Sequence, residues 1–246
     1  MGQPSRLIME SLWPSLRPDP NVAVIGANGG IGQALVHYLD AGVFPDELHT
    51  FSRNAGAGIE DEATVAKFAR QAAQGGPLDA VIVATGLLHD EHGLGPEKRL
   101  SDINATNLLR SFEANAVGPA LVAKHFLPLL RRDSKTVFVA LSARVGSISD
   151  NRLGGWAAYR ASKAALNMLL KTAAIEHRRS HPHSVVAAMH PGTVDTRLSE
   201  PFQANVPAGK LFTPHQAARQ ITQVIDQLTP ADSGGFFAWD GSPIEY

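Results

Sequence analysis

The 246-residue sequence predicts an α/β fold, a doubly wound parallel sheet with helices on both faces. Two observations support this prediction. Short apolar runs rich in β-branched residues recur along the chain, and a continuous apolar run is typical of a strand buried on both faces. Stretches with helical periodicity separate these runs, and such alternation favours a parallel sheet.

The apolar runs that we predict as strands cover residues 22–25, 48–51, 80–84, 136–140, 185–189 and 235–238. After the second run, residues 54–57 are rich in Gly and Ala where a further strand is expected, and only Gly58 and Ile59 offer a remnant of it. The third strand of the sheet is therefore predicted to be short or missing.

The stretches that we predict as helices cover residues 31–40, 60–74, 103–130, 156–177 and 214–228. Thr213 and Pro214 mark the start of the last helix, because Thr is a preferred N-cap and Pro suits the first helical position. The sequence has neither an internal repeat nor a linker, so residues 21–246 are predicted to form one domain. Residues 1–20 include Pro14, Pro18 and Pro20 and are predicted to be an N-terminal arm.

The composition excludes several classes of function. The chain has 22 Lys and Arg against 23 Asp and Glu, so neither nucleic acid nor an anionic membrane is an expected partner. No stretch approaches the roughly 18 uninterrupted apolar residues of a membrane span, and we expect a cytoplasmic protein. Cysteine is absent, which excludes disulfides, Cys-ligated zinc and a thiol nucleophile. Any redox chemistry must therefore come from a cofactor.

A glycine-rich loop, from Gly26 through Asn28, Gly30 and Ile31 to Gly32, follows the first predicted strand and opens a helix. Glycines in this context let the backbone approach a pyrophosphate at a helix N-terminus. The alternative is a tight turn that binds no ligand. The flanking strand and helix favour a dinucleotide site.

About twenty residues further on, Ser52 and Arg53 follow the second strand, where an acid would bind the ribose 2′-hydroxyl of NAD. An arginine there would pair with the 2′-phosphate of NADP instead. The sequence therefore predicts NADP(H) in preference to NAD(H), with a solvated Arg53 as the alternative.

Tyr159 and Lys163 are four residues apart in a predicted helix and so share one face. A phenol titrates near pH 10, and a nearby ammonium would help it to act as an acid or base near neutrality. Ser142 ends a predicted strand and Asn115 lies in a predicted helix, and either alone would be an ordinary polar residue.

These motifs, in this order, resemble the short-chain dehydrogenase/reductase family from Asn21 onward. Thr85-Gly86 stands in the position of the family's Ala-Gly, and Pro191-Gly192-Thr193-Val194-Asp195-Thr196 follows the fifth predicted strand. The segment 142–148 and the ending 234–241 are most similar to the C-factor-like branch, which is named for a bacterial cell-cell signal. The resemblance implies a Rossmann-like fold.

The resemblance also implies roles for single residues. Tyr159 would donate the proton to a carbonyl, Lys163 would lower its pKa and bind the nicotinamide ribose, Ser142 would hold the carbonyl, and Asn115 would position a water. The cofactor would contact Gly26, Asn28, Gly30, Ile31, Gly32, Ser52, Arg53, Ile59, Thr85, Gly86, Asn115, Tyr159, Lys163, Pro191, Gly192, Val194 and Thr196. Val83-Ala84 replaces the family's asparagine pair, and we expect Thr85 to compensate for the lost hydrogen bonds. Glu60 or Asp61 would help Ile59 to cover the adenine.

We therefore expect an NADP(H)-dependent carbonyl reductase or alcohol dehydrogenase that acts on a small carbonyl or alcohol. A C-factor-type signalling or sensor protein with little turnover is the alternative, and a structural subunit is a weaker one. By resemblance, the helices 103–130 and 156–177 would form the interface of a homodimer or homotetramer.

Substrate contacts are expected outside the carboxyl ends of the strands. The expected residues are 87–88, Arg144, Val145, 153–156 and a lid at 198–211, with His89 and His92 as further candidates. Trp156 would either stack on a flat substrate or pack against the lid. His177, His181 and His183 allow a metal site, but the neighbouring Arg178, Arg179 and Pro182 favour a solvated loop, and no metal is predicted.

Overall fold

The computed structural model describes residues 13–41, 47–53 and 58–246. Within them, the central sheet has the strand order β2-β1-β3-β4-β5-β8, and every neighbouring pair is parallel. The strands are β1 (Val22–Ile25), β2 (Leu48–Phe51), β3 (Ala80–Val83), β4 (Thr136–Leu141), β5 (Ser184–His190) and β8 (Phe236–Ala238). The predicted parallel α/β sheet is confirmed.

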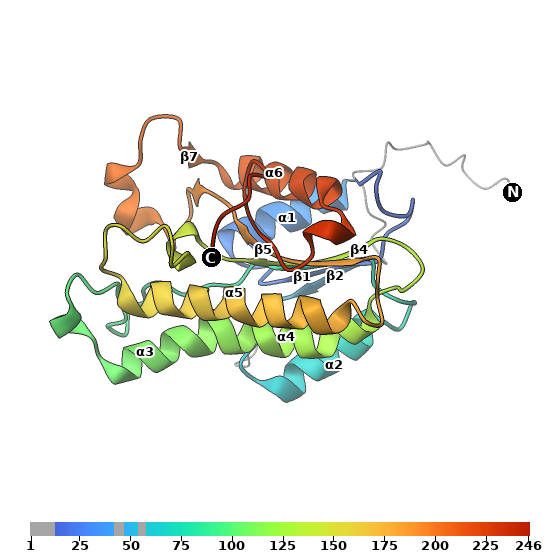
Figure 1. The fold of residues 1–246 in the computed structure, drawn as a ribbon, viewed down its shortest axis with the longest axis horizontal. Helices are drawn as coiled ribbons and strands as arrows, with labels where there is room; N and C mark the ends of the chain where they lie inside the picture. Colours follow the sequence, from blue (N-terminus) through green and yellow to red (C-terminus); the bar gives the residue numbers. More distant parts are fainter. Residues whose placement is uncertain (1–12, 42–46, 54–57) are drawn as a thin grey trace, which may run out of the picture.

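Two helical layers cover the sheet (Figure 1). Helices α1 (Gly30–Asp40) and α6 (Pro214–Gln227) lie on one face, and α2 (Glu62–Ala72), α4 (Gly118–Phe126) and α5 (Ala157–His177) lie on the other. The side chains of β1, β3, β4 and β5 are almost fully buried, because alternate residues of each strand enter the two opposite cores. This explains why the strands are continuous apolar runs in the sequence.

The expectation of a missing strand agrees with the described residues. Between Phe51 and Ala80 the described part of the chain contains α2 and no strand, and β3 pairs directly with β1. The Gly/Ala segment 54–57 lies outside the described residues. Gly58 and Ile59 form the turn before α2, and Ile59 is 6% exposed.

The predicted helix 103–130 is wrong as a single element. It consists of α3 (Ala105–Phe112), a π-helical turn (Glu113–Val117), α4 and a short 3₁₀ turn (Leu127–Leu129). The π turn has a reason in the packing, since it places Asn115 at 0% exposure against the loop that follows β3. The start of α6 is confirmed, with Thr213 and Gln216 in a reciprocal capping box.

The described part of the predicted N-terminal arm packs on α6. Trp13 is 1% exposed and its indole N–H donates to the carbonyl oxygen of Thr222 at 2.9 Å. Leu16 is 8% exposed and belongs to the core on the same face of the sheet. Residues 1–12 of the arm lie outside the described residues.

Candidate active site

The glycine-rich loop lies at the carboxyl end of β1, where the strand order reverses. In the sheet, β2 lies on one side of β1 and β3 lies on the other, so the chain changes direction across the sheet at β1. Ligands of doubly wound sheets bind at such a point. Gly26 has φ 89°, and a Cβ there would lie 2.9 Å from Cγ2 of Thr85. A Cβ on Gly32 would lie 2.0 Å from the carbonyl oxygen of Gly26. Larger residues would push this loop open.

The N-terminus of α1 is suited to an anion. Its N-cap is Gly29, no side chain caps it, and its first turn holds no acidic residue. The first N–H groups of a helix lack intrahelical partners and carry a partial positive charge. A Cβ on Gly30 would lie 2.5 Å from Cγ2 of Thr196, so the segment after β5 closes over this helix end. The arrangement fits a pyrophosphate.

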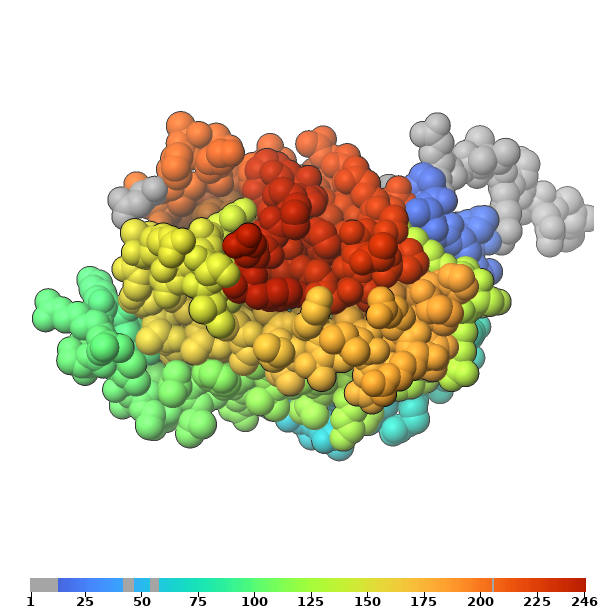
Figure 2. All heavy atoms as spheres, viewed as in Figure 1, coloured from blue at the N-terminus to red at the C-terminus, as the bar shows by residue number. Residues whose placement is uncertain are grey.

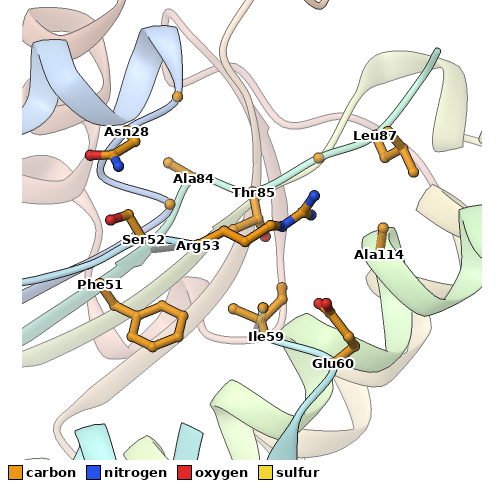
Figure 3. Close-up of a pocket in the computed structure, with 14 residues that line it drawn as sticks. Asn28, Phe51, Ser52, Arg53, Ile59, Glu60, Ala84, Thr85, Leu87 and Ala114 are labelled. Carbon is orange, nitrogen blue, oxygen red and sulfur yellow. The ribbon is translucent and has the colours of Figure 1, made fainter. Parts of the chain in front are cut away.

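A cavity of about 290 Å³ next to this loop contains many of the predicted cofactor residues (Figure 3). Ser52 and Arg53 line it from the end of β2, and the Arg53 side chain extends across it. Glu60 also lines the cavity, whereas Asp61 does not. Among the described residues, no carboxylate forms an ion pair with Arg53. The other predicted residues in its wall are Gly26, Asn28, Ile59, Thr85 and Gly86.

Thr85 does not replace the missing asparagine pair as expected. Its Oγ1 is buried and has no hydrogen-bond partner within the described part of the chain, while the residue lines the cavity. A buried hydroxyl without a partner is costly and points to a group that is absent from the protein alone. This hydroxyl fits a ribose or phosphate oxygen of a dinucleotide.

Tyr159 and Lys163 lie in the first two turns of α5, with 8% and 2% exposure. The Lys163 ammonium donates to the carbonyl oxygen of Leu141 at 2.9 Å and lies 5.9 Å from the centroid of the Tyr159 ring. Burial lowers the pKa of Lys163 to about 8, so the side chain is mostly charged at neutral pH.

The direction predicted for the pKa of Tyr159 is wrong for this geometry. Burial raises the pKa of Tyr159 above its ordinary value. The Lys163 ammonium is close to the ring but is held by a backbone carbonyl, and its charge does not offset the loss of hydration. The phenol is therefore a neutral proton donor in the chain as it stands.

Ser142 directly follows β4 and is 4% exposed. Its hydroxyl donates to Oδ1 of Asn167 at 2.7 Å. Asn115 forms a reciprocal pair of hydrogen bonds with the backbone of Leu87, each 2.8 Å long. Its Nδ2 also donates to the hydroxyl of Ser162 at 3.1 Å, which joins it to α5. The expected water at Asn115 stays a prediction.

A second cavity, of about 240 Å³, has Ser142 and Tyr159 in its wall. Its remaining lining is largely apolar and includes Trp156, Phe202 and Val206. Among the described residues that line it, Arg144 alone has a fixed charge. Besides Tyr159, five predicted cofactor residues line it, namely Ile31, Pro191, Gly192, Val194 and Thr196. Lys163 lies beside this wall, so the cavity brings the proposed proton-transfer groups together with the far end of the cofactor cleft.

The predicted lid contributes Leu198, Ser199, Phe202 and Val206 to this wall. The predicted contacts at 153–155 are wrong, because these residues do not line the cavity and Leu153 is 92% exposed. Trp156 packs against the lid, with its ring centroid 4.9 Å from that of Phe202. His89 reaches the carbonyl oxygen of Arg197 at 3.0 Å and lines the adjoining cleft.

Sequence reasoning missed Glu97, Asn167 and His190. His190 lines the second cavity, and burial lowers its pKa to about 4. Asn167 had a signal, since it is four residues beyond Lys163 on the same helix face, and His190 directly precedes Pro191. Glu97 had no local signal, because only the folded chain brings it to the site.

The predicted solvated loop of histidines is wrong for two of its three members. His177 and His181 are 8% and 2% exposed, and their rings stack with centroids 4.0 Å apart. Burial, with the nearby His181 and Arg132, lowers the pKa of His177 to about 4. His183 is exposed. Among the described residues, no three metal-ligating side chains converge.

Comparison with known proteins agrees with this site. The short chain dehydrogenase family matches residues 52–207. The 1-hydroxy-2-glutathionyl-2-methyl-3-butene dehydrogenase of Rhodococcus sp. is 33% identical over 92% of this chain and 99% of the relative. C-signal of Myxococcus xanthus is 34% identical over 70% of this chain and 94% of the relative.

The fold is also that of an NADPH-bound carbonyl reductase from chicken fatty liver, with a TM-score of 0.76 at 21% identity over 97% of this chain and 100% of that one. The predicted likeness to the C-factor-like branch is confirmed by C-signal. No described helix has the length and apolarity that crossing a membrane requires. The match over residues 52–207 and the relatives that extend it together show that the chain belongs to the short-chain dehydrogenase/reductase family of oxidoreductases.

Proposed function

We propose that this protein is an NADP(H)-dependent carbonyl reductase or alcohol dehydrogenase that acts on a small carbonyl or alcohol. One observation carries the proposal. Ser142 and Tyr159 line the same 240 Å³ cavity, and the ammonium of the buried Lys163 lies 5.9 Å from the centroid of the Tyr159 ring. A neutral phenol, a hydroxyl and an ammonium in this arrangement are suited to proton transfer at a carbonyl oxygen.

Tyr159, Lys163 and Ser142 have separate roles in the proposed reaction. Bound NADP(H) would supply or accept the hydride. Tyr159 gives its proton to the carbonyl oxygen, the new O–H bond completes the alcohol, and the phenolate that remains is stabilised by the charge on Lys163. Ser142 forms a hydrogen bond with the same oxygen and fixes its position. In alcohol oxidation the proton returns to Tyr159.

The cofactor cleft supports NADP(H) through three separate groups. The uncapped end of α1 would bind the pyrophosphate, and the unpaired Oγ1 of Thr85 would bond to a ribose or phosphate oxygen. Ser52 and Arg53 would bind the 2′-phosphate, which NAD lacks. The chicken carbonyl reductase, which has the same fold, is bound to NADPH, and this is consistent with the assignment.

The test combines binding with turnover. NADPH and NADH at matched concentrations should both raise the midpoint of thermal unfolding, NADPH by more, because a ligand that binds the folded state stabilises it. A panel of ketones and aldehydes should then contain a substrate. Tyr159→Phe should abolish reduction of this substrate, while NADPH still raises the midpoint of thermal unfolding. Tyr38→Phe on α1 is the matched control and should keep both the reduction and the rise in midpoint.

The alternative function is a signalling or sensor role, and the likeness to C-signal is the observation that favours it. A protein of that kind would bind NADPH and show no turnover across the panel. A single substrate that requires Tyr159 would exclude it.

We further propose that the protein is a homodimer or homotetramer formed through α3, α4 and α5. These helices lie side by side on the surface in Figure 2, α5 in yellow and orange and the other two in green. Large apolar residues are exposed on α3 and α5, namely Leu109 at 70%, Met168 at 66%, Leu169 at 41% and Ile175 at 52%. Val117, in the π turn between α3 and α4, is 47% exposed. Sedimentation should give at least twice the monomer mass of 26.2 kDa, and Met168→Glu should reduce it.

A further inference from the structure

Asn167 is a buried polar residue to which the proposed mechanism assigns no role. It is 1% exposed and lies on α5, four residues after Lys163 and eight after Tyr159. Side chains at this spacing share one helix face, so Asn167 extends the row formed by Tyr159 and Lys163. That face meets the carboxyl end of β4, where Lys163 contacts Leu141 and Asn167 contacts Ser142.

The orientation of the Asn167 amide follows from its two neighbours. Nδ2 donates a long hydrogen bond, of 3.5 Å, to the carbonyl oxygen of Gly146, and a carbonyl oxygen can only accept. The opposite orientation would set two oxygens against each other. Oδ1 therefore faces Ser142 and accepts its hydroxyl proton at 2.7 Å. The absence of a side chain on Gly146 permits this approach, because a Cβ there would lie 2.8 Å from Cβ of Lys163.

This bond decides what Ser142 presents to the cavity. A serine hydroxyl has one proton and two lone pairs, and here the proton is directed at Asn167. Ser142 thus presents only its lone pairs to the cavity. A carbonyl oxygen also only accepts, so Ser142 must turn its proton from Asn167 to the substrate before it can hold a carbonyl. The bond to Asn167 holds the Ser142 oxygen in place until the proton turns to the substrate.

We propose that Asn167 is a positioning residue that acts through Ser142, fixing the place of the Ser142 hydroxyl and competing with the substrate carbonyl for its proton. This inference depends on the proposed function, since it requires a carbonyl that Ser142 binds. Asn167 itself does not line the substrate cavity.

A double-mutant cycle tests whether Asn167 acts through Ser142. Asn167→Leu, which removes the acceptor at similar volume, should lower kcat for the carbonyl about tenfold, because the Ser142 hydroxyl is no longer held in place. KM should not rise, because the variant also removes the acceptor that competes with the carbonyl for the Ser142 proton. Ser142→Ala should lower kcat by at least as much, and the double variant should equal Ser142→Ala alone. Losses that multiply, or no loss in Asn167→Leu, would overturn the inference. Asn107→Leu, at a partly exposed site on α3, is the control.

A second variant covers the case in which Asn167→Leu does not fold. A protonated Asp reproduces both hydrogen bonds of Asn, whereas the carboxylate cannot donate to Gly146 and holds the Ser142 proton more strongly. Asn167→Asp should therefore be close to wild type at low pH and lose kcat/KM as the new carboxyl ionises. A pH profile parallel to that of wild type would contradict the inference.

The Ser142 hydroxyl proton gives a readout that does not depend on turnover. A proton held in a buried bond exchanges slowly, so its NMR signal should be visible in the wild type and absent in Asn167→Leu. Absence of the signal in the wild type would overturn the inference. If the wild type reduces no carbonyl at all, both the proposed function and this inference fail. If the wild type is active and Asn167→Leu is equally active, only this inference fails.

Discussion

The carboxylate of Glu97 accepts a hydrogen bond from the backbone N–H of Ala158, at 3.2 Å, in the first turn of α5. Glu97 is 7% exposed and lies in the loop that follows β3. Its own carbonyl oxygen accepts from the N–H of Trp156 at 2.6 Å. Trp156, the N-cap of α5, has φ 55°, an unfavourable value for a bulky residue. Glu97 thus holds both the strained cap and the helix start directly before Tyr159.

Glu97→Ala should therefore destabilise the protein and impair turnover. The free energy of unfolding should fall by about 1 kcal/mol, because an anion that caps a helix N-terminus contributes about this much. Urea unfolding measures the change. Turnover should fall as well, because Tyr159 is the next residue after Ala158. Glu91→Ala, in the same loop with a side chain 77% exposed, should change neither quantity. A variant as stable as wild type would show that the cap is not needed.

Arg53→Ala should change the preference between cofactors. Loss of a charged hydrogen bond to the 2′-phosphate should weaken NADPH binding about tenfold or more, and NADH binding should stay within about twofold. Titration calorimetry with both cofactors measures the ratio. Arg70→Ala, an exposed arginine on α2, is the control. An equal loss for both cofactors would place Arg53 on a part of the nucleotide that they share.

Lys163→Met should stabilise the fold at neutral pH while it removes activity. The pKa of Lys163 is about 8 in the folded chain and 10.5 in the unfolded one, so the unfolded state binds more protons between these values. The free energy of unfolding of the wild type should therefore rise through this window. Between pH 7 and pH 10 it should rise by about 2 kcal/mol more than that of the variant. Urea unfolding at these two pH values gives the difference. The exposed Lys67→Met should show no such change relative to wild type.

His177 should make the fold sensitive to acid. Its pKa is about 4 in the folded chain and 6.5 in the unfolded one, so the stability that it contributes is complete above pH 6.5 and is lost as the pH falls towards 4. From pH 7 to pH 4.5 the wild type should lose about 2 kcal/mol more than His177→Gln. The exposed His183→Gln serves as control and should follow the wild type. Parallel curves for His177→Gln would mean that this histidine is hydrated in solution.

Local rules predicted the parts of the fold that local chemistry decides. The strands were visible because a strand buried on both faces has to be apolar throughout. The start of α6 was visible because Thr213 is an N-cap and Pro214 suits the first helical position, without help from the rest of the chain. The helix at 103–130 was predicted without its break. The π turn at Asn115 results from hydrogen bonds to Leu87, which helical periodicity does not contain.

The same division holds for the candidate site. Residue types and their spacing were enough to identify the family, the order of its motifs and the helix face shared by Tyr159 and Lys163, since these depend on single segments of the chain. The burial that raises the pKa of Tyr159, the contact of Ser142 with Asn167 and the support of α5 by Glu97 became visible only in three dimensions. Hydration, hydrogen-bond partners and pKa values depend on which segments meet in space, and these meet only in the folded chain.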